Sequence, residues 1–303
     1  MKSTFPRCLA IVLALGVLPA IPAGASGIRP APAQRVTILY DAFGNRAGLT
    51  RDWGFAALVE YGGRRILFDT GDNAEIFAAN VRALGLDLSQ LDFVVISHRH
   101  GDHIAGIPYL LRVNPGVTIY APSERFGIFG SSLPGSFLPP DTLLPDSLRY
   151  FDGHPPARLS FGSAWPSAHF TLVDSTTEIV PGISVILTVS DRPGTLELRE
   201  LSLAISTPRG LVLLVGCSHP GIETILQASR PVGGHVFQLI GGLHLVATPD
   251  SEIARIAVAL HDQWRIDRMS PGHCTGEHAF AELRRVFGAG YLYAGLGTVL
   301  DLP

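Results

Sequence analysis

Lysine is almost absent from this chain of 303 residues: Lys2 is the only one, while lysine and arginine together number 23. The rest of the sequence therefore excludes a phosphate-binding loop with its lysine, a Schiff-base lysine and the S-x-x-K arrangement of a serine nucleophile. Basic residues form no block, and the formal net charge is −3. A nucleic-acid partner is not expected, because such binding requires a clustered positive surface.

Cysteine is also scarce, with three residues at Cys8, Cys217 and Cys274. A disulfide between Cys217 and Cys274 is one interpretation, because an exported protein can keep such a bond. Each of these two cysteines lies within two residues of a histidine. Those neighbours favour thiols at or near a metal site, with the disulfide as the alternative.

Long apolar runs are missing after the first residues of the chain. The run over residues 8–18 follows the positive charges of Lys2 and Arg7, and residues 23–25 form a small-residue site of the A-x-A type. Residues 1–25 are therefore expected to be a signal peptide that is cleaved after Ala25. A membrane anchor is the alternative, but the run is short for a span and is followed by prolines. The mature protein is expected in the periplasm or outside the cell, with no stable membrane insertion.

Residues 26–303 are expected to form one α/β domain. Apolar runs predict strands, and apolar residues at helical spacing predict helices. A β-rich half and a helix precede a second β-rich half and further helices, which predicts two packed sheets with helices outside, a four-layer αββα sandwich. The predicted strands begin at Val36, Phe55, Arg65, Asp92, Ile183, Leu201, Leu211 and His235, with helices over about 73–84, 104–112, 221–229, 250–263 and 277–287.

The stretch from about residue 121 to residue 166 differs from the rest, because it is rich in Pro, Gly and Ser. Loops of this length in a compact domain are usually functional or disordered, so we interpret the stretch as an insertion that could serve as a lid. Its aromatic side chains are expected to supply apolar walls of a substrate pocket, with packing inside the insertion as the alternative. These residues are Phe126, Phe129, Phe137, Tyr150, Phe151 and Trp165.

A cluster of metal-binding residue types follows the predicted strand DFVVIS. His98, His100, Asp102 and His103 place three imidazoles and one carboxylate within six residues. These ligands suit zinc, manganese or iron. A turn at this point can aim His98 and His100 to one side and Asp102 and His103 to the other, which would create two adjacent metal pockets. A histidine-rich solvated loop would not explain why a buried strand leads directly into the cluster.

The H-x-H-x-D-H motif, together with Asp69-Thr70-Gly71 upstream, resembles the metallo-β-lactamase superfamily. The resemblance implies two divalent metal ions, expected to be Zn2+ with Mn2+ or Fe as alternatives. It implies that His98 and His100 bind the first ion and that Asp102 and His103 bind the second. Asp69 would orient the ligand loop without binding metal itself.

Three downstream motifs each place a histidine at the end of a predicted strand. The set is similar to the branch of 7,8-dihydropterin-6-methyl-4-(β-D-ribofuranosyl)-aminobenzene-5'-phosphate synthases, and Asp52-Trp53-Gly54 and Leu201-Ser202-Leu203 also fit that branch. The motifs are GCSHPG around Cys217 and His219, GGLHL around His244, and PGHCTG around His273 and Cys274.

One departure from the superfamily pattern concerns the residue that bridges both metals. Common superfamily hydrolases use an aspartate where this chain has Cys217, and His219 lies two residues further on. His219 is expected to bind the first metal and His273 the second. Cys217 would either bridge the metals or pack behind His219, the second being favoured. His244 would be a ligand, a substrate contact or a cap of the sheet edge.

These residues predict an exported hydrolase in which a metal-activated water attacks a small-molecule ester, lactone or phosphodiester, with Asp102 binding metal and holding a proton. The first alternative is a transferase like the dihydropterin branch, which export disfavours because phosphorylated intermediates normally stay in the cytoplasm. The second alternative is a non-hydrolytic metal or redox protein that uses the same ligands with iron. The sequence does not indicate an oligomeric state.

Overall fold

The structure, a computed structural model, describes residue 1 and residues 33–303 apart from 125–127, 131, 139–140, 161–163 and 196. The expected signal peptide therefore lies outside the described residues, except for Met1. Among the helices of the described part, none combines the length and the apolar character that a membrane span requires.

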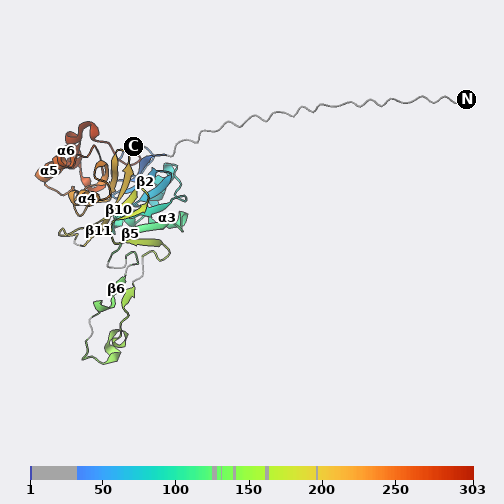
Figure 1. The fold of residues 1–303 in the computed structure, drawn as a ribbon, viewed down its shortest axis with the longest axis vertical. Helices are drawn as coiled ribbons and strands as arrows, with labels where there is room; N and C mark the ends of the chain where they lie inside the picture. Colours follow the sequence, from blue (N-terminus) through green and yellow to red (C-terminus); the bar gives the residue numbers. More distant parts are fainter. Residues whose placement is uncertain (2–32, 125–127, 131, 139–140, 161–163, 196) are drawn as a thin grey trace. The chain divides into compact units, whose positions relative to one another are not determined.

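Two sheets stack face to face in the body of the molecule (Figure 1). The first sheet has the strand order β15-β1-β2-β3-β4-β5-β8. Its strands are β1 (Arg35–Tyr40), β2 (Ala56–Tyr61), β3 (Arg64–Phe68), β4 (Phe93–Val95), β5 (Thr118–Pro122), β8 (His169–Val173) and β15 (Val299–Asp301).

The second sheet has the strand order β14-β13-β12-β11-β10-β9. Strands β12, β13 and β14 run parallel, so their carboxyl ends meet at one edge of this sheet. Its strands are β9 (Thr177–Val180), β10 (Ile183–Val189), β11 (Arg199–Thr207), β12 (Gly210–Val215), β13 (Val236–Gly242) and β14 (Arg268–Gly272).

Alternating side chains divide the core into three layers, because successive residues of a strand point to opposite faces. Ala57 and Val59 of β2 lie in the layer between the sheets, whereas Leu58 faces the other way. Val212 of β12 also faces the first sheet, and Leu213 points outward. The central layer is therefore shared by both sheets, and each sheet keeps a second apolar face that helices cover.

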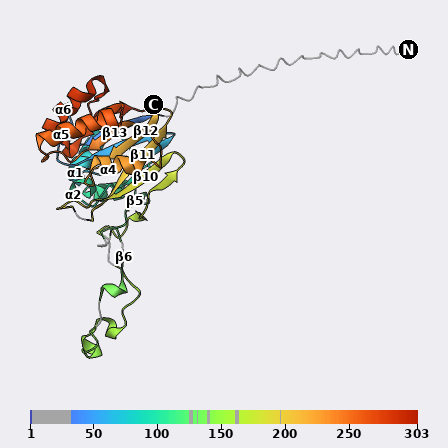
Figure 2. The same ribbon diagram turned by 60° about the vertical axis from the view of Figure 1, so that its left-hand side comes forward.

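Helices α1 to α3 cover the outer face of the first sheet, and α4 to α6 cover that of the second. Helices α5 and α6 lie side by side (Figure 2). The αββα fold class expected from the sequence is confirmed. The α-helices are α1 (Ala74–Ala83), α2 (Gly101–Ile104), α3 (Ile107–Val113), α4 (Ile222–Ser229), α5 (Asp250–Val258) and α6 (Glu277–Phe287). Shorter helical turns are η1 (Gly135–Phe137), η2 (Asp146–Leu148), η3 (Tyr150–Gly153), η4 (Ala259–Gln263), η5 (His273–Thr275) and η6 (Gly288–Gly290).

The helix predicted over 104–112 is found as α3, but it begins only at Ile107, because a break at Gly106 separates it from α2. Gly106 lies against Thr70, and a side chain at this position would overlap the Thr70 carbonyl oxygen. The Thr70 hydroxyl accepts a hydrogen bond from the Gly106 N–H at 3.2 Å. The Asp69-Thr70-Gly71 turn therefore packs into the break between the two helices, directly behind the histidine motif.

The stretch expected to be an insertion begins later than residue 121, because β5 continues to Pro122. Within the stretch, β6 (Ser132–Pro134) and β7 (Arg158–Ser160) pair with each other in a two-stranded sheet of their own. Phe129 is buried and packs on Phe170 of the first sheet, and Trp165 also contacts Phe170. Phe129 and Trp165 therefore take part in local packing, which was the alternative to forming walls of a substrate pocket.

Two other aromatic residues of the stretch, Tyr150 and Phe151, are exposed, and Tyr150 lines a cavity formed within the stretch itself, together with Leu144 and Leu148. Phe126 and the side chain of Phe137 lie outside what the structure describes.

Candidate metal centre

Four loops that follow strands bring the predicted site residues together. His98 and His100 lie in the loop between β4 and α2, Asp102 and His103 lie in α2 itself, and the GCSH turn follows β12. The loops after β13 and β14 carry His244 and His273. Because β12, β13 and β14 are parallel, their three loops emerge at the same edge of the second sheet.

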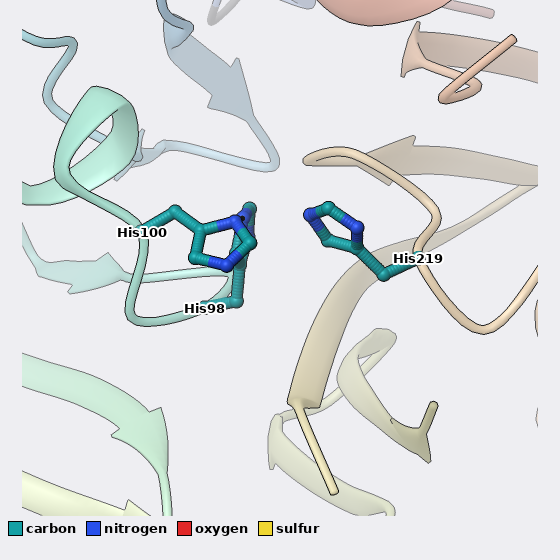
Figure 3. Close-up of side chains that lie close together, drawn as sticks. All are labelled: His98, His100 and His219. Atoms are coloured by element: carbon teal, nitrogen blue, oxygen red, sulfur yellow. Dashed lines mark hydrogen bonds between the residues drawn. The ribbon is translucent and has the colours of Figure 1, made fainter. Parts of the chain in front are cut away.

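His98, His100 and His219 form the first triad. Their rings point toward one another from two separate loops (Figure 3), and their ligand nitrogens all lie within 4.8 Å. His98 Nε2 is 3.2 Å from His100 Nδ1. Two nitrogens that bind one tetrahedral zinc ion at about 2.1 Å lie about 3.4 Å apart, so the spacing suits such an ion.

Asp102, His103 and His273 form the second triad, which also fits within 4.8 Å. Asp102 Oδ2 lies 3.2 Å from His273 Nε2 and 3.8 Å from His103 Nε2. The structure therefore brings all six residues expected to bind metal into two adjacent sets of three.

The hydrogen bonding of the histidine ring nitrogens indicates whether these two sets fit metal ions. Both ring nitrogens of His219 and both of His273 are buried and make no hydrogen bond of normal geometry among the described residues, although His273 Nε2 lies 3.2 Å from the Asp102 carboxylate. A buried polar atom without a partner is costly, and it is unusual in a folded protein. A metal ion in each triad would satisfy one nitrogen of each ring, so the residues present fit two divalent ions.

The three imidazoles of the first triad are in the neutral protonation state, which is the state that binds metal. Burial, supported by repulsion from neighbouring imidazoles, lowers the pKa of His98 and His100, and it lowers the pKa of His219 to about 3. These rings are therefore neutral near pH 7, with a free lone pair for a metal.

The second triad behaves differently. Burial opposes protonation of His103, but the carboxylates of Asp69 and Asp102 raise the pKa of its imidazole to about 9. Burial also opposes ionisation of Asp102, yet contact with His273 and the charge of His103 hold the pKa of this carboxyl below its usual range. A metal ion must therefore displace a proton from His103 to use it.

Asp69 fixes the start of the loop that carries His98 and His100 through hydrogen bonds to Ser97. Its carboxylate accepts hydrogen bonds from the Ser97 N–H and the Ser97 hydroxyl, both at 2.7 Å, and it lies 2.7 Å from His103 Nδ1. This contact leaves Nε2 as the His103 nitrogen that faces the site. Asp69 thus lies where the resemblance places an orienting carboxylate.

Glu200 holds the backbone of the GCSH turn in place in the same way as Asp69 holds the loop at Ser97. Glu200 was not identified from the sequence. This fully buried residue of β11 accepts hydrogen bonds from three consecutive backbone N–H groups, at 3.0 Å from Cys217, 2.7 Å from Ser218 and 2.9 Å from His219. Burial raises the pKa of the Glu200 carboxyl to about 7, although these hydrogen bonds act in the opposite direction. The signal in the sequence was a charged residue next to the apolar run LSLAIS.

Asp41 is a third buried carboxylate with this role, also missed. It accepts a hydrogen bond from the His273 N–H at 2.9 Å, across 232 residues of sequence. Burial raises the pKa of Asp41 to about 8. Its only sequence signal was a carboxylate at the end of the predicted strand VTILYD.

The two internal cysteines are buried free thiols, so the disulfide alternative is not what the structure shows. Cys217 Sγ lies 3.2 Å from His103 Nε2, close enough to belong to the centre. Cys274, expected to lie at or near the metal site but not named as a ligand, has its Sγ 3.3 Å from Cys217 Sγ. The His244 ring lies 4.2 Å from the His219 ring, and His244 is exposed.

The fold is similar to that of the metallo-β-lactamase superfamily, and the two ligand sets could each hold a metal ion. A family model of the metallo-beta-lactamase superfamily matches residues 50–174. A solved structure described as Tm1679, a metal-dependent hydrolase of the beta-lactamase superfamily, is 27% identical, with a TM-score of 0.63 and coverage of 88% of this chain and 98% of that one. The metallo-beta-lactamase fold protein YhfI from Bacillus subtilis shares the fold at 16% identity, with a TM-score of 0.57 over 89% of this chain and 100% of that one.

A curated relative supports the branch indicated by the downstream motifs. The chain is 27% identical over 246 residues to the 7,8-dihydropterin-6-methyl-4-(beta-D-ribofuranosyl)-aminobenzene-5'-phosphate synthase of Methanocaldococcus jannaschii, covering 72% of this chain and 79% of the relative. The resemblance to the metallo-β-lactamase superfamily and to this branch is therefore confirmed.

Replacing His98 should remove metal without unfolding the protein. We expect His98→Ala to lose about one metal ion per chain, because two imidazoles alone hold zinc weakly. Metal analysis after dialysis, with circular dichroism to check the fold, measures this. His235→Ala is the matched control, since that histidine is exposed and pairs with Asp267. Full metal occupancy in His98→Ala would remove His98 from the ligand set.

Replacing Glu200 should change how the stability of the metal-free protein depends on pH. Because burial raises the pKa of Glu200 from 4.5 to about 7, the folded state holds this proton more tightly than the unfolded chain. The contribution to stability is therefore present below about pH 4.5 and is lost as pH rises through about 7. The loss is on the order of 3 kcal/mol.

In Glu200→Gln this contribution should vanish. Urea unfolding of metal-free protein at pH 5 and pH 8 measures it, and the exposed Glu277→Gln is the matched control. An unchanged difference between the two pH values in Glu200→Gln would contradict the assignment.

Proposed function

We propose that this protein is a metal-dependent hydrolase that acts on a small-molecule ester, lactone or phosphodiester. The observation that carries the proposal is the pair of adjacent ligand triads, His98/His100/His219 and Asp102/His103/His273. When two divalent ions are bound, they supply a water activated at neutral pH and polarise the group under attack. Zinc is the metal proposed first, because the donor set of imidazole, carboxylate and nearby thiol suits it.

The chain's own residues would orient the reaction. Asp102 is a carboxylate near pH 7 and is partly exposed, so it can accept a hydrogen bond from the attacking water and orient it. His244 is exposed next to His219 and can contact the substrate. Trp53 has 45% of its surface exposed and its ring lies 4.9 Å from that of His273, which offers a flat apolar wall on the other side of the centre.

A second candidate is the transferase reaction of the dihydropterin branch. The specific observation in its favour is the relative named as a synthase of that branch. A flat wall such as Trp53 would suit a pterin ring as well as other apolar groups. A third candidate, a redox protein with iron, uses the same ligands and is distinguished by the metal that the protein carries.

A substrate panel tests the hydrolase proposal. Zinc-loaded protein should hydrolyse at least one member of a panel of lactones, β-lactams, phosphodiesters and thioesters. This activity should disappear on metal removal and in His98→Ala, and persist in His235→Ala. Turnover of a pterin with a phosphoribosyl acceptor, without hydrolysis, would favour the transferase. Bound iron with a redox spectrum and no turnover would favour the third candidate.

We also propose that the protein is exported after removal of residues 1–25. The support is the charged start, the apolar run over 8–18 and the A-x-A site. Mass spectrometry of the protein from its native host should give a chain that starts at or near Ser26. A chain that retains Met1 in the cytoplasmic fraction would overturn export without affecting the metal centre.

A further inference from the structure

Three loops of the second sheet converge on the thiol of Cys274. Its Sγ lies 3.3 Å from the Cys217 Sγ and 3.7 Å from the Cys217 carbonyl oxygen, both in the GCSH turn. The His244 side chain also lies within hydrogen-bonding reach of this thiol. Cys274 is buried, with 2% of its surface exposed.

The GGLH loop leaves room for this thiol. A Cβ at Gly242 would lie 2.8 Å from the Cys274 Sγ, which is closer than real contacts allow. The same Cβ would also overlap the Gly216 carbonyl oxygen of the neighbouring loop. A glycine at this position therefore allows both cysteine-bearing turns to pack together.

Sulfur and nitrogen donors meet at this point in a set that shares His273 with the second triad but adds two sulfur atoms. Cys217, His273 and Cys274 each offer one ligand atom, and the three atoms lie within 4.8 Å of one another. All three residues are buried, and within the described residues neither ring nitrogen of His273 makes a hydrogen bond of normal geometry, the Asp102 carboxylate being 3.2 Å from its Nε2.

We propose that Cys217, His273 and Cys274 form a sulfur-rich binding site for a thiophilic metal ion, as an alternative position for the second ion. Because His273 belongs both to this set and to the Asp102/His103 set, one ion excludes the other. Soft thiolate ligands select soft ions such as cadmium most strongly, whereas carboxylate and imidazole also bind zinc and manganese. The identity of the metal would therefore decide which side of His273 it occupies.

This inference rests on the proposed metal centre but not on hydrolysis, so a spectroscopic test separates the two. Metal-free, full-length Cys8→Ser protein, kept reduced by a phosphine, is titrated with Cd2+ alone. The Cys8 substitution leaves Cys217 and Cys274 as the only thiols. We expect a near-ultraviolet sulfur-to-cadmium charge-transfer band, reduced to roughly half in Cys274→Ser and in Cys217→Ser, because each thiolate contributes separately.

Two further variants complete the design. Asp102→Asn should keep the cadmium band but lose one bound Mn2+, measured by electron paramagnetic resonance, whereas Cys274→Ser should keep its manganese. Thr275→Ser controls for disturbance of the turn, because serine retains the hydroxyl that bonds to Gly272 and Leu243. An unchanged band in Cys274→Ser would overturn the proposal. Loss of the band in Asp102→Asn would also overturn it, because the sulfur would then act only within the Asp102 set.

Discussion

Buried carboxylates that hold ligand loops are the constraint on which this centre depends. Asp69, Glu200 and Asp41 are each completely buried, and each binds the backbone of a loop that carries candidate ligands. A carboxylate that accepts backbone N–H bonds fixes the main chain, which a contact between side chains alone does not do. The imidazoles can then meet at one point although they come from both sheets.

The same carboxylates make the centre depend on cations. Burying an ionised group without a nearby opposite charge is costly, which is why burial raises the pKa of Glu200 and of Asp41. In the first triad the neighbouring histidines are neutral near pH 7 and supply no compensating charge. Two divalent ions would supply it and favour the ionised carboxylates. Metal binding and the hydrogen bonding of the loops therefore stabilise each other.

The sequence predicted those features of the molecule that depend on residues close together in the chain. The H-x-H-x-D-H motif is contiguous, and the strands and helices that surround it follow clear apolar patterns, so the layered fold and six candidate ligands could be found. Glu200 and Asp41 could not be assigned in this way, because their partners are distant in sequence and a lone carboxylate beside a strand has no distinctive pattern. The break at Gly106 was missed for a related reason: it arises from contact with Thr70, not from the helix itself.

Strain in the backbone follows from the same arrangement. In the described part of the chain, eight residues other than glycine have a positive φ, and Asp69, Ser218, His244 and His273 are four of them. Such conformations cost roughly 1–3 kcal/mol each and persist only where surrounding contacts impose them. Glu200 binds the turn at Ser218, and Asp41 binds the N–H of His273. Asp69 binds the loop of the histidine motif through Ser97. The hydrogen bonds of these carboxylates therefore offset the cost of the unfavourable backbone conformations in the ligand loops.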